Sequence, residues 1–295
     1  MDFCVVTARR IAHITPIKRQ QVFDALPLRA PDAHKGSFGR VLCVCGCADF
    51  RGAAALSCLG ALRTGAGLVT LAADECVIRS VAARILEATF LPLPDDAALV
   101  RAVCKSSVCL AGCGLYANAQ TAAQMTQLLQ NAQGCVILDA GGLCSLAGQE
   151  DVLRLAAGRL LVTPHLGEMA VLTGLSVAQV QRQAGRLALD FSKRTGAVVV
   201  LKSHRTLVAT PEGALYENRT GNAGLARGGS GDVLAGMLAG LAAGGLSPVL
   251  AAVCGVFLHG AAADLCAARL SMRGMLPEDI LHDVCTLFLE NERAM

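Results

Sequence analysis

Short apolar runs alternate with longer segments of helical period along most of the chain. Residues 40–46 predict a buried strand that ends in a glycine turn, residues 52–65 predict a helix of small residues, and residues 67–72 predict a second strand. A connection of this length joins parallel strands, because antiparallel neighbours need only a short turn. This part of the chain therefore predicts a β–α–β unit.

The same alternation continues to residue 217. Further strands are expected at 107–111, 135–139, 160–163, 197–202, 207–209 and 214–217, the last two as a hairpin, and helices at 119–130, 167–173 and 177–195. From Asp232 onward the pattern predicts helices that stack through small residues. Alternation of this kind predicts an α/β fold with a central, mostly parallel sheet flanked by helices on both faces. Such sheets bind ligands beyond the carboxyl ends of their strands.

No linker, low-complexity tract or repeat divides the 295 residues, so we expect one domain over 1–295, with residues 1–30 as an N-terminal extension packed on it. The opening residues hold one brief apolar run followed by Arg9 and Arg10, which does not fit a signal peptide. The most apolar region, 233–270, is interrupted by glycines, a proline and polar residues, so neither half offers the roughly 20 apolar residues that span a bilayer. We expect no membrane segment.

The composition narrows the function classes. Hydrophobic residues make up 54% of the chain and charged residues 17%, which excludes disorder. The chain has a net charge of +3, no tryptophan and an aromatic content of 3%. It therefore lacks the strongly basic surface and the stacking aromatic residues that are typical of nucleic-acid-binding proteins. Most of the 14 cysteines lie in apolar runs, where reduced, buried thiols are expected, and this predicts a cytoplasmic protein. Cys43, Cys45 and Cys47 would share one face of a strand, but no second cluster of zinc-type spacing accompanies them.

The sharpest chemical feature is the glycine-rich stretch at 221–232, which leads into an apolar helix. Gly228, Gly229 and Gly231 leave backbone N–H groups unshielded, and the helix that starts near Asp232 directs its positive end at the same place. Together they predict an anion hole suited to phosphate. Asp232 can act there as a plain N-cap, or as the base that takes the proton of an attacking hydroxyl, and the glycine content alone does not choose between these roles.

Neither standard nucleotide signature is present. The glycine-rich stretch lacks the Lys-Ser/Thr ending of a P-loop, and no early strand leads into G-x-G-x-x-G with a following acid. A nucleotide site in this chain must therefore be of another kind.

Several blocks resemble the motifs of the NAD(P)H-hydrate dehydratase family, which belongs to the ribokinase-like superfamily. They are HKGSFGR at 34–40, RGAA at 51–54, RTGAGLVT at 63–70, TPHLGE at 163–168 and TGNAGLARGGSGDVLAG at 220–236, in family order over nearly the whole chain. The resemblance implies a ribokinase-like fold and repair of hydrated NADH and NADPH. Bacterial members use ADP as the phosphoryl donor and release AMP, and eukaryotic members use ATP.

The resemblance also implies a mechanism and site residues. The donor's terminal phosphoryl group passes to the ring hydroxyl of the S-epimer, and elimination of phosphate then restores the coenzyme. Asp232 would be the base, and the amides of Gly229, Ser230 and Gly231 would neutralise the transferring group. Asp232 would also contact the hydrated dinucleotide, together with Ala53, Gly114 and His165. The adenine nucleotide would be held by Lys202, Ser203, His204, Arg205, Thr206 and Gly231.

Each of these assignments has a structural alternative. His165 follows a proline and can simply cap the helix expected at 167–173, and Lys202 can reach solvent past a buried strand. The glycines at 112 and 114 can form a plain turn. His259 and Asp264 lie on apolar helices and are expected to be satisfied polar residues in the packing rather than catalysts. For Glu168 two roles stay open, ordering of the His165 loop or contact with a magnesium-bound water.

Three positions depart from the family pattern. Tyr116 replaces the last glycine of a G-P-G-L-G loop and either narrows the substrate entrance or points outward. Gly141 replaces the second acid of a D-A-D motif, and Ser203 replaces a glycine in the nucleotide strand. None of them touches the glycine-rich centre at 228–232, so they bear on affinity more than on reaction class.

Two rival functions stay open at this stage, a ribokinase-like kinase of a small molecule such as a vitamin precursor, and a non-catalytic nucleotide-binding module. Family members use Mg²⁺ held by the phosphates and water, so no protein ligand to the metal is expected. The family also implies a homotetramer and a coupled epimerase. Only about thirty residues precede the first motif, too few for a domain, so the epimerase is expected on a separate chain.

Overall fold

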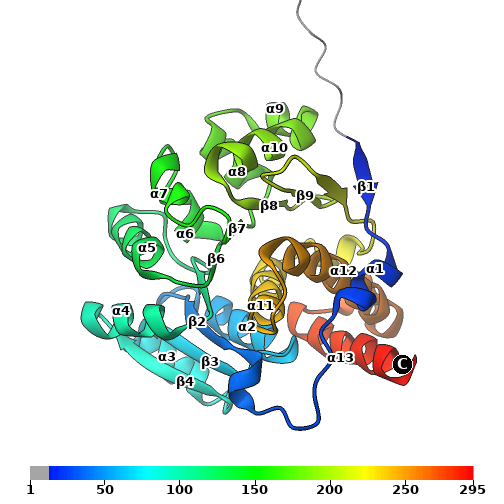
Figure 1. Cartoon of the computed structure of the whole chain (residues 1–295), viewed down its shortest axis with the longest axis horizontal. Coiled ribbons are helices and arrows are strands. Elements are labelled where there is room, and N and C mark those ends of the chain that lie inside the picture. Colours follow the sequence, from blue (N-terminus) through cyan, green and yellow to red (C-terminus); the bar gives the residue numbers. More distant parts are fainter. Residues whose placement is uncertain (1–12, 295) are drawn as a thin grey trace, which may run out of the picture.

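The computed structural model describes residues 13–294 and contains one ten-stranded sheet (Figure 1). The strand order is β1-β10-β9-β8-β7-β6-β5-β2-β3-β4. All neighbours are parallel except at β9, which runs antiparallel to both β8 and β10. The order reverses at β2, where β5 lies on one side and β3 on the other. Such a reversal opens a crevice at the carboxyl ends of the strands.

The strands are short and almost entirely apolar. They are β1 (Ile14–Pro16), β2 (Arg40–Val44), β3 (Leu68–Asp74), β4 (Ala88–Leu93), β5 (Val108–Ala111), β6 (Cys135–Leu138), β7 (Leu160–Val162), β8 (Val198–Leu201), β9 (Leu207–Ala209) and β10 (Leu215–Glu217). Parallel strands are apolar on both sides because helices cover both faces of the sheet. In β2, Val41 and Cys43 face one hydrophobic core while Leu42 and Val44 face the other.

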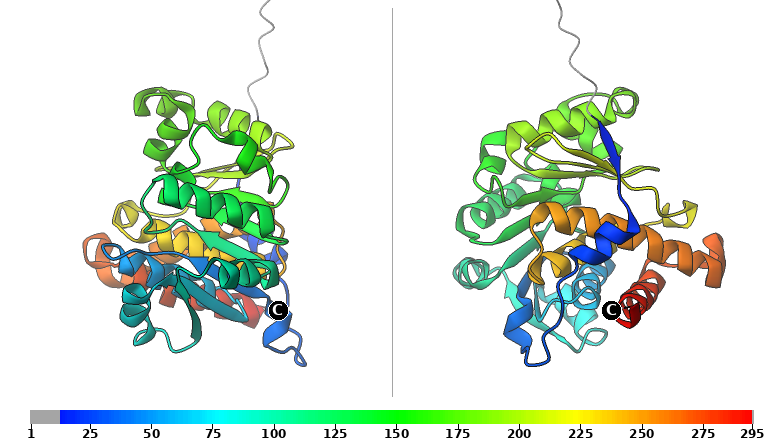
Figure 2. Two further views of the ribbon diagram at one scale, coloured as in Figure 1. Left: turned by 90° about the vertical axis from the view of Figure 1, so that its left-hand side faces the viewer. Right: turned by 45° about the vertical axis from the view of Figure 1, so that its right-hand side comes forward.

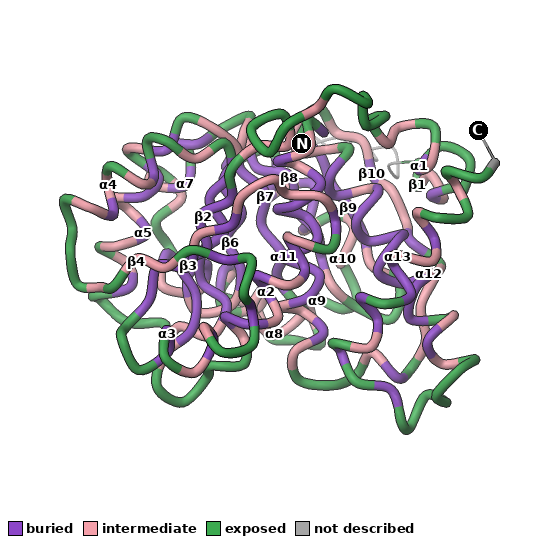
Figure 3. The backbone as a smooth tube through the Cα atoms, turned by 90° about the horizontal axis from the view of Figure 1, so that it is seen from below, coloured by how far each residue is buried: buried purple, intermediate pink, exposed green. Residues whose placement is uncertain are grey.

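The helices form one layer on each face of the sheet (Figure 2). One layer contains α1 (Arg19–Ala25), α2 (Arg51–Arg63), α3 (Glu75–Ala82), α11 (Ser230–Ala243), α12 (Pro248–Gly274) and α13 (Pro277–Ala294). The other contains α4 (Asp96–Lys105), α5 (Ala119–Asn131), α6 (Ala140–Cys144), α7 (Glu150–Arg154), α8 (Leu166–Thr173), α9 (Val177–Arg182) and α10 (Ala184–Thr195). Two short 3-10 turns, η1 (Lys35–Phe38) and η2 (Ala223–Leu225), complete the elements. Burial is concentrated in the sheet and in the inner helices (Figure 3).

Close packing of α2 against α11 fixes the start of α11. A Cβ atom added at Gly236 would lie 2.2 Å from the carbonyl oxygen of Ser57, and one added at Gly60 would lie 2.7 Å from that of Val233. Backbones this close admit no side chain at these positions. The small residues of the two segments therefore set the position of the glycine-rich end of α11.

Helix α12 is long and apolar enough to cross a membrane by length and composition. In the structure 67% of its most apolar stretch is buried inside the protein, as in the core helix of a globular fold. The sequence analysis divides the apolar region into two halves at several interruptions. In the structure the helices are interrupted only at 244–247, between α11 and α12, and the second half is one helix of 27 residues.

The predicted α/β fold, with its mostly parallel sheet and its hairpin of β9 and β10, is confirmed. The single helix predicted at 177–195 is wrong, because the chain breaks at Gln183 between α9 and α10. The elements between 75 and 105, together with β1, α1, α6 and α7, were not predicted. Residues 1–12 lie outside the described residues, and with them the stretch tested for a signal peptide and part of the expected extension.

Candidate active site

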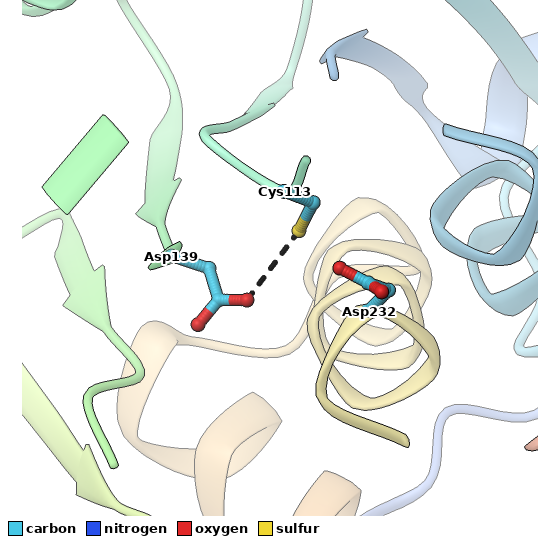
Figure 4. Close-up of side chains that lie close together, drawn as sticks. All are labelled: Cys113, Asp139 and Asp232. Carbon is cyan, nitrogen blue, oxygen red and sulfur yellow. Dashed lines mark hydrogen bonds between the residues drawn. The ribbon is translucent and has the colours of Figure 1, made fainter. Parts of the chain in front are cut away.

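Four consecutive strands end at one place and deliver the polar side chains of the site. Cys113 follows β5, Asp139 follows β6, Thr163 follows β7, and Lys202 follows β8. The first turn of α11 brings Asp232 to the same point from the opposite side. Figure 4 shows Cys113, Asp139 and Asp232 turned toward one another, and one ligand atom from each lies within 4.8 Å of the others. The predicted position beyond the carboxyl ends of the strands is therefore where acidic groups gather.

Asp139 is the most heavily bonded group of this cluster. Its Oδ1 accepts hydrogen bonds from Thr163 Oγ1 at 2.6 Å and from Lys202 Nζ at 2.7 Å, and its Oδ2 accepts one from Cys113 Sγ at 3.5 Å. The carboxylate is buried. A buried carboxylate needs donors of this kind, and this set fixes the positions of Thr163, Lys202 and Cys113 around Asp139.

Asp232 has no such set of partners. Burial raises the pKa of Asp232 to about 7, and the neighbouring charges of Asp139 and Cys45 add to the rise, while Lys202 and Cys113 oppose it. A carboxylate with a pKa near neutrality can both accept and release a proton under physiological conditions. The two aspartates thus differ, because Asp139 is held by three hydrogen bonds whereas Asp232 is the group with a pKa near neutrality.

Lys202 points into the centre, so the structural alternative, in which its side chain only reaches solvent past a buried strand, is wrong. Its side chain is 18% exposed, and Nζ lies 2.7 Å from Asp139 and 3.9 Å from Glu168 Oε2. Burial alone would lower the pKa of Lys202, but the charges of Asp139 and Glu168 outweigh it and raise that pKa. Burial also raises the pKa of Glu168. The centre therefore contains one fixed cation among three acids.

The start of α11 offers an open set of backbone donors. Gly229 takes the N-cap position with φ of 96°, which a residue with a side chain rarely adopts. The N–H of Ser230 points at the carbonyl oxygen of Arg227 at 3.3 Å, and the helical ladder begins with Val233 N–H bonded to Gly229. Among the described residues, no acceptor meets the N–H groups of Gly231 and Asp232. Gly231 lies beside Lys202, because a Cβ added there would be 3.3 Å from Nζ. The anion hole thus combines two free amides with an ammonium group.

His165 caps α8. Its Nδ1 accepts from the N–H groups of Gly167 and Glu168 at 3.0 and 3.1 Å, and Glu168 Oε2 accepts from His165 N–H at 2.7 Å. This reciprocal box confirms that His165 caps the helix and that Glu168 orders its loop. The imidazole stays exposed, so its expected contact with the dinucleotide remains a prediction.

The residues expected to hold the adenine nucleotide lie after β8. Ser203, His204 and Arg205 are exposed, and Thr206 is half-buried before β9 begins. Ser203 Oγ donates to the carbonyl oxygen of Arg205 at 2.7 Å, which closes a tight loop. Lys202 starts this loop, so the structure brings the nucleotide residues next to the anion hole. Their contact with a nucleotide remains a prediction.

Two of the residues expected to line the dinucleotide face each other across a narrow gap. Gly114 lies in the loop after β5 and Ala53 in the first turn of α2, and a Cβ added at Gly114 would be 2.7 Å from that of Ala53. Gly114 has φ of 68°. The glycine loop is therefore seated on α2 and is more than a plain turn, while its contact with substrate remains a prediction.

His259 and Asp264, the two residues of α12 singled out from the sequence, differ in their hydrogen bonding. Asp264 is satisfied, because it accepts from Gly221 N–H and from Asn222 Nδ2, both at 2.9 Å, and so orders the loop that precedes α11. The expectation of satisfied packing is wrong for His259, whose buried Nε2 has no hydrogen-bond partner among the described residues. Burial lowers the pKa of His259 to about 4, so it is neutral.

The cluster of Cys113, Asp139 and Asp232 does not fit a resident magnesium ion. Mg²⁺ requires six oxygen ligands in a near-ideal octahedron, and the third member here is a buried thiol. Lys202 Nζ already occupies Asp139 Oδ1 at 2.7 Å. A divalent cation at this centre would have to bring its own oxygen ligands.

None of the 13 cysteines among the described residues is in a disulfide. Cys43 and Cys45 belong to the same core, whereas Cys47 lies beyond the strand and is half-buried, so the expected shared face holds for the first two only. Sequence reasoning also missed Cys113 as a partner of Asp139, and the ion pair between Asp139 and Lys202. This ion pair could have been predicted from the order of the strands, because β6 and β8 are separated only by β7.

Comparison with known proteins assigns a family. A family model described as NAD(P)H-hydrate dehydratase matches residues 41–285. The ADP-dependent (S)-NAD(P)H-hydrate dehydratase of Xanthomonas campestris pv. campestris is 37% identical over 88% of this chain and 91% of that protein. A bifunctional NAD(P)H-hydrate repair enzyme of Moorella thermoacetica is 39% identical over 87% of this chain. The chain spans about half the length of that bifunctional relative.

Solved structures agree with the sequence matches. The ADP/ATP-dependent NAD(P)H-hydrate dehydratase of Bacillus subtilis, co-crystallized with ATP/Mg²⁺, has a TM-score of 0.81 at 28% identity and covers 94% of this chain and 99% of that chain. The hydroxyethylthiazole kinase of Pyrococcus horikoshii has a TM-score of 0.62 at 13% identity, over 92% of this chain and 93% of that chain, which shows a shared fold alone.

Proposed function

The chain belongs to the NAD(P)H-hydrate dehydratase family, and from this premise we propose that it dehydrates the S-epimer of hydrated NADH and NADPH at the expense of ADP. The products are AMP, inorganic phosphate and the restored coenzyme. The observation that carries the proposal is the position of Asp232, a titrating carboxylate in the first turn of a 14-residue helix whose free amides lie beside Lys202.

The first step is phosphorylation of the ring hydroxyl. Hydroxide is a poor leaving group, whereas phosphate is a good one. Asp232 takes the hydroxyl proton while the oxygen attacks the terminal phosphorus of ADP, and the bond from that phosphorus to AMP breaks. The pKa of Asp232 near 7 suits this role, because its ionised form is available at neutral pH.

Charge on the transferring group is neutralised by the N–H groups at the start of α11 and by the Lys202 ammonium. Gly231 and Asp232 supply the free amides, while the N–H of Ser230 is shared with the carbonyl oxygen of Arg227. Gly229 positions the helix start through its left-handed conformation. Preorganised donors of this kind supply the largest share of the rate in phosphoryl transfer.

The second step is elimination. The carbon–oxygen bond of the phosphorylated ring breaks, phosphate leaves, and a proton is lost from the neighbouring ring carbon, so that the ring double bond returns. We assign the dinucleotide contacts to Ala53, Gly114, His165 and Asp232, and the adenine-nucleotide contacts to Lys202, Ser203, His204, Arg205, Thr206 and Gly231. The positions of Gly114 against Ala53 and of the loop after β8 support this division.

Magnesium enters as a complex with the nucleotide, because the protein's own ligand set does not fit the ion.

We further propose a cytoplasmic homotetramer, formed by one domain over 1–295 with residues 1–30 packed on it and coupled to a separate epimerase. The large apolar side chains left exposed around the end of α12 and the start of α13, Leu270, Met272 and Leu276, support assembly. Light scattering of the purified protein measures its oligomeric state.

A direct assay tests the proposed activity. Hydrated NADH is mixed with purified protein and ADP or ATP, and recovery of the reduced-nicotinamide absorbance is followed together with AMP formation. Recovery that depends on ADP and matches AMP in amount supports the dehydratase. A stable phosphorylated product without recovery of absorbance would assign a kinase instead.

A further inference from the structure

Tyr116 lies two residues after Gly114, in the loop that follows β5, and its ring is half-exposed. Its exposed fraction is 49%, and its hydroxyl donates a hydrogen bond to Asp49 Oδ2. The ring of Phe50 packs edge-on against it, with centroids 5.7 Å apart and planes at 65°. The Asp49 bond raises the pKa of Tyr116 to about 12, so the hydroxyl stays a donor. The hydrogen bond to Asp49 and the contact with Phe50 thus hold the ring of Tyr116 with one face toward solvent.

The loop that carries Tyr116 packs directly on Gly141. A Cβ added at Gly141 would lie 1.9 Å from the carbonyl oxygen of Leu115 and 3.1 Å from the carbonyl carbon of Tyr116. No residue with a side chain could fit at position 141 against this loop. Gly141 therefore makes room for the loop and fixes where the ring of Tyr116 begins.

Tyr116 also lines a cavity of about 940 Å³. The cavity starts at the loop after β5, passes over the carboxyl ends of β2, β3 and β4, and follows α5. Its wall is rich in neutral side chains that form hydrogen bonds, namely Asn118, Gln120, Thr121, Gln124, Thr126, Gln127 and Gln130. Pockets of roughly 300–1,000 Å³ are the usual size for small ligands. The catalytic centre uses none of these residues.

We propose that this cavity is the subsite for the adenosine half of the hydrated dinucleotide, with the adenine ring stacked on Tyr116. The proposal rests on the proposed function and names where the non-reacting end of that substrate binds. Adenine is the ring to expect here, because water addition turns two trigonal carbons of the nicotinamide ring into tetrahedral ones and leaves it puckered. Adenine stays planar and aromatic, and such rings stack well on tyrosine. The amide side chains of α5 suit the ring nitrogens and ribose hydroxyls.

Tyrosine fluorescence reports this contact directly. The chain has no tryptophan and two tyrosines, and the second, Tyr216, lies on β10 toward the far end of the sheet. In a Tyr216→Phe background the emission comes from Tyr116 alone. With AMP present to fill the nucleotide site, NADH should quench this emission, and reduced nicotinamide mononucleotide, which lacks adenine, should not. Free tyrosine corrects for absorption by the ligands.

Steady-state kinetics tests the same contact. Tyr116→Gly and Tyr116→Leu should raise KM for hydrated NADH about five- to 150-fold, from the free energy of one base stacked on an aromatic ring, and leave kcat and the KM for ADP unchanged. Tyr116→Phe keeps the ring and should stay within about twofold of the native protein. Tyr216→Phe is the matched control.

The outcomes separate this subsite from the proposed reaction. Normal turnover with an unchanged KM in both Tyr116 variants and no quenching would overturn the subsite and leave the function intact. Quenching by NADH in a protein without dehydratase activity would retain the dinucleotide subsite and remove the function. Equal quenching by the mononucleotide would place the nicotinamide ring on Tyr116 and overturn the proposal.

Discussion

The two ends of the proposed substrate site are built in opposite ways. The centre, formed by Cys113, Asp139, Glu168, Lys202 and Asp232, is largely buried and crowded with charge that is paired or shifted in pKa. The mouth, formed by Asp49, Phe50, Tyr116 and the cavity along α5, is open and lined mainly by neutral side chains. The difference indicates that the centre serves to handle charge during phosphoryl transfer and the mouth serves to recognise shape.

The two ends also differ in how freely a sequence can change them. Replacing any charged member of the centre leaves another charge buried without its partner, which is costly. At the mouth, Tyr116 contacts Asp49 and Phe50, which are both exposed. Substitutions are therefore expected to cost less at the mouth, where no buried charge depends on them.

The largest expected effect is at the centre. Asp232→Asn should lower kcat by about 10²–10⁴-fold or more, because it removes the base and keeps the size of the side chain. Binding of ADP, followed by calorimetry, should stay within a few-fold of the native value. A variant that retains turnover would transfer the role of the base to another group and end the contrast between the two aspartates.

Lys202 tests the charge pairing of the centre. Lys202→Met should lower the free energy of unfolding by about 3–5 kcal/mol, because it leaves Asp139 buried without its cation. Urea denaturation measures this, and the double variant Asp139→Asn/Lys202→Met should lose less than the sum of the single variants. Additive losses would show that the two residues are not coupled.

The pKa of Asp232 predicts the acid limb of the reaction. The base works in its ionised form, so kcat/KM for the hydrate should rise about tenfold per pH unit up to about pH 7 and then level off. In Asp139→Asn a neighbouring negative charge that adds to the rise is lost, and the limb should move to lower pH. A profile that is flat between pH 5 and 8 would contradict the assigned base.

The same shift predicts a pH-dependent change in stability. The pKa of Asp232 is raised in the folded protein, so ionising it costs stability, and the cost appears as pH rises from the unfolded value of about 3.9 toward 7. Asp232→Asn should therefore raise Tm at pH 8 and leave it nearly unchanged at pH 4. Calorimetry at the two pH values checks the sign, and a lower Tm at pH 8 would contradict it.

The smallest effect is expected at the mouth. The described residues that line the cavity include Asp74 and Asp96 and no Lys, Arg or His. Hydrated NADH should be preferred over hydrated NADPH by about two- to five-fold in kcat/KM, because the extra phosphate meets negative charge at an exposed site. Asp74→Asn and added salt should each reduce the preference. A preference for the phosphorylated coenzyme would mean that the adenosine half lies elsewhere.

The sequence predicted the centre better than the mouth. The motifs placed Asp139, Lys202 and Asp232 at the ends of strands and at the start of a helix, and parallel strands bring such positions together. It did not predict that Lys202 turns inward onto Asp139, because this depends on the order of β6, β7 and β8 in the sheet. The cavity was missed because α3, β4 and α4 were not predicted, and the ends of β3 and β4 form its floor.

The fate of the ring oxygen tests the central claim most directly. Hydrated NADH is prepared in ¹⁸O-labelled water so that its ring hydroxyl carries the label, and it is then turned over with ADP in ordinary water. Phosphorylation followed by elimination predicts that one ¹⁸O atom appears in each inorganic phosphate released, as measured by mass spectrometry. Recovery of NADH together with unlabelled phosphate would show that the hydroxyl leaves without being phosphorylated and would contradict the account.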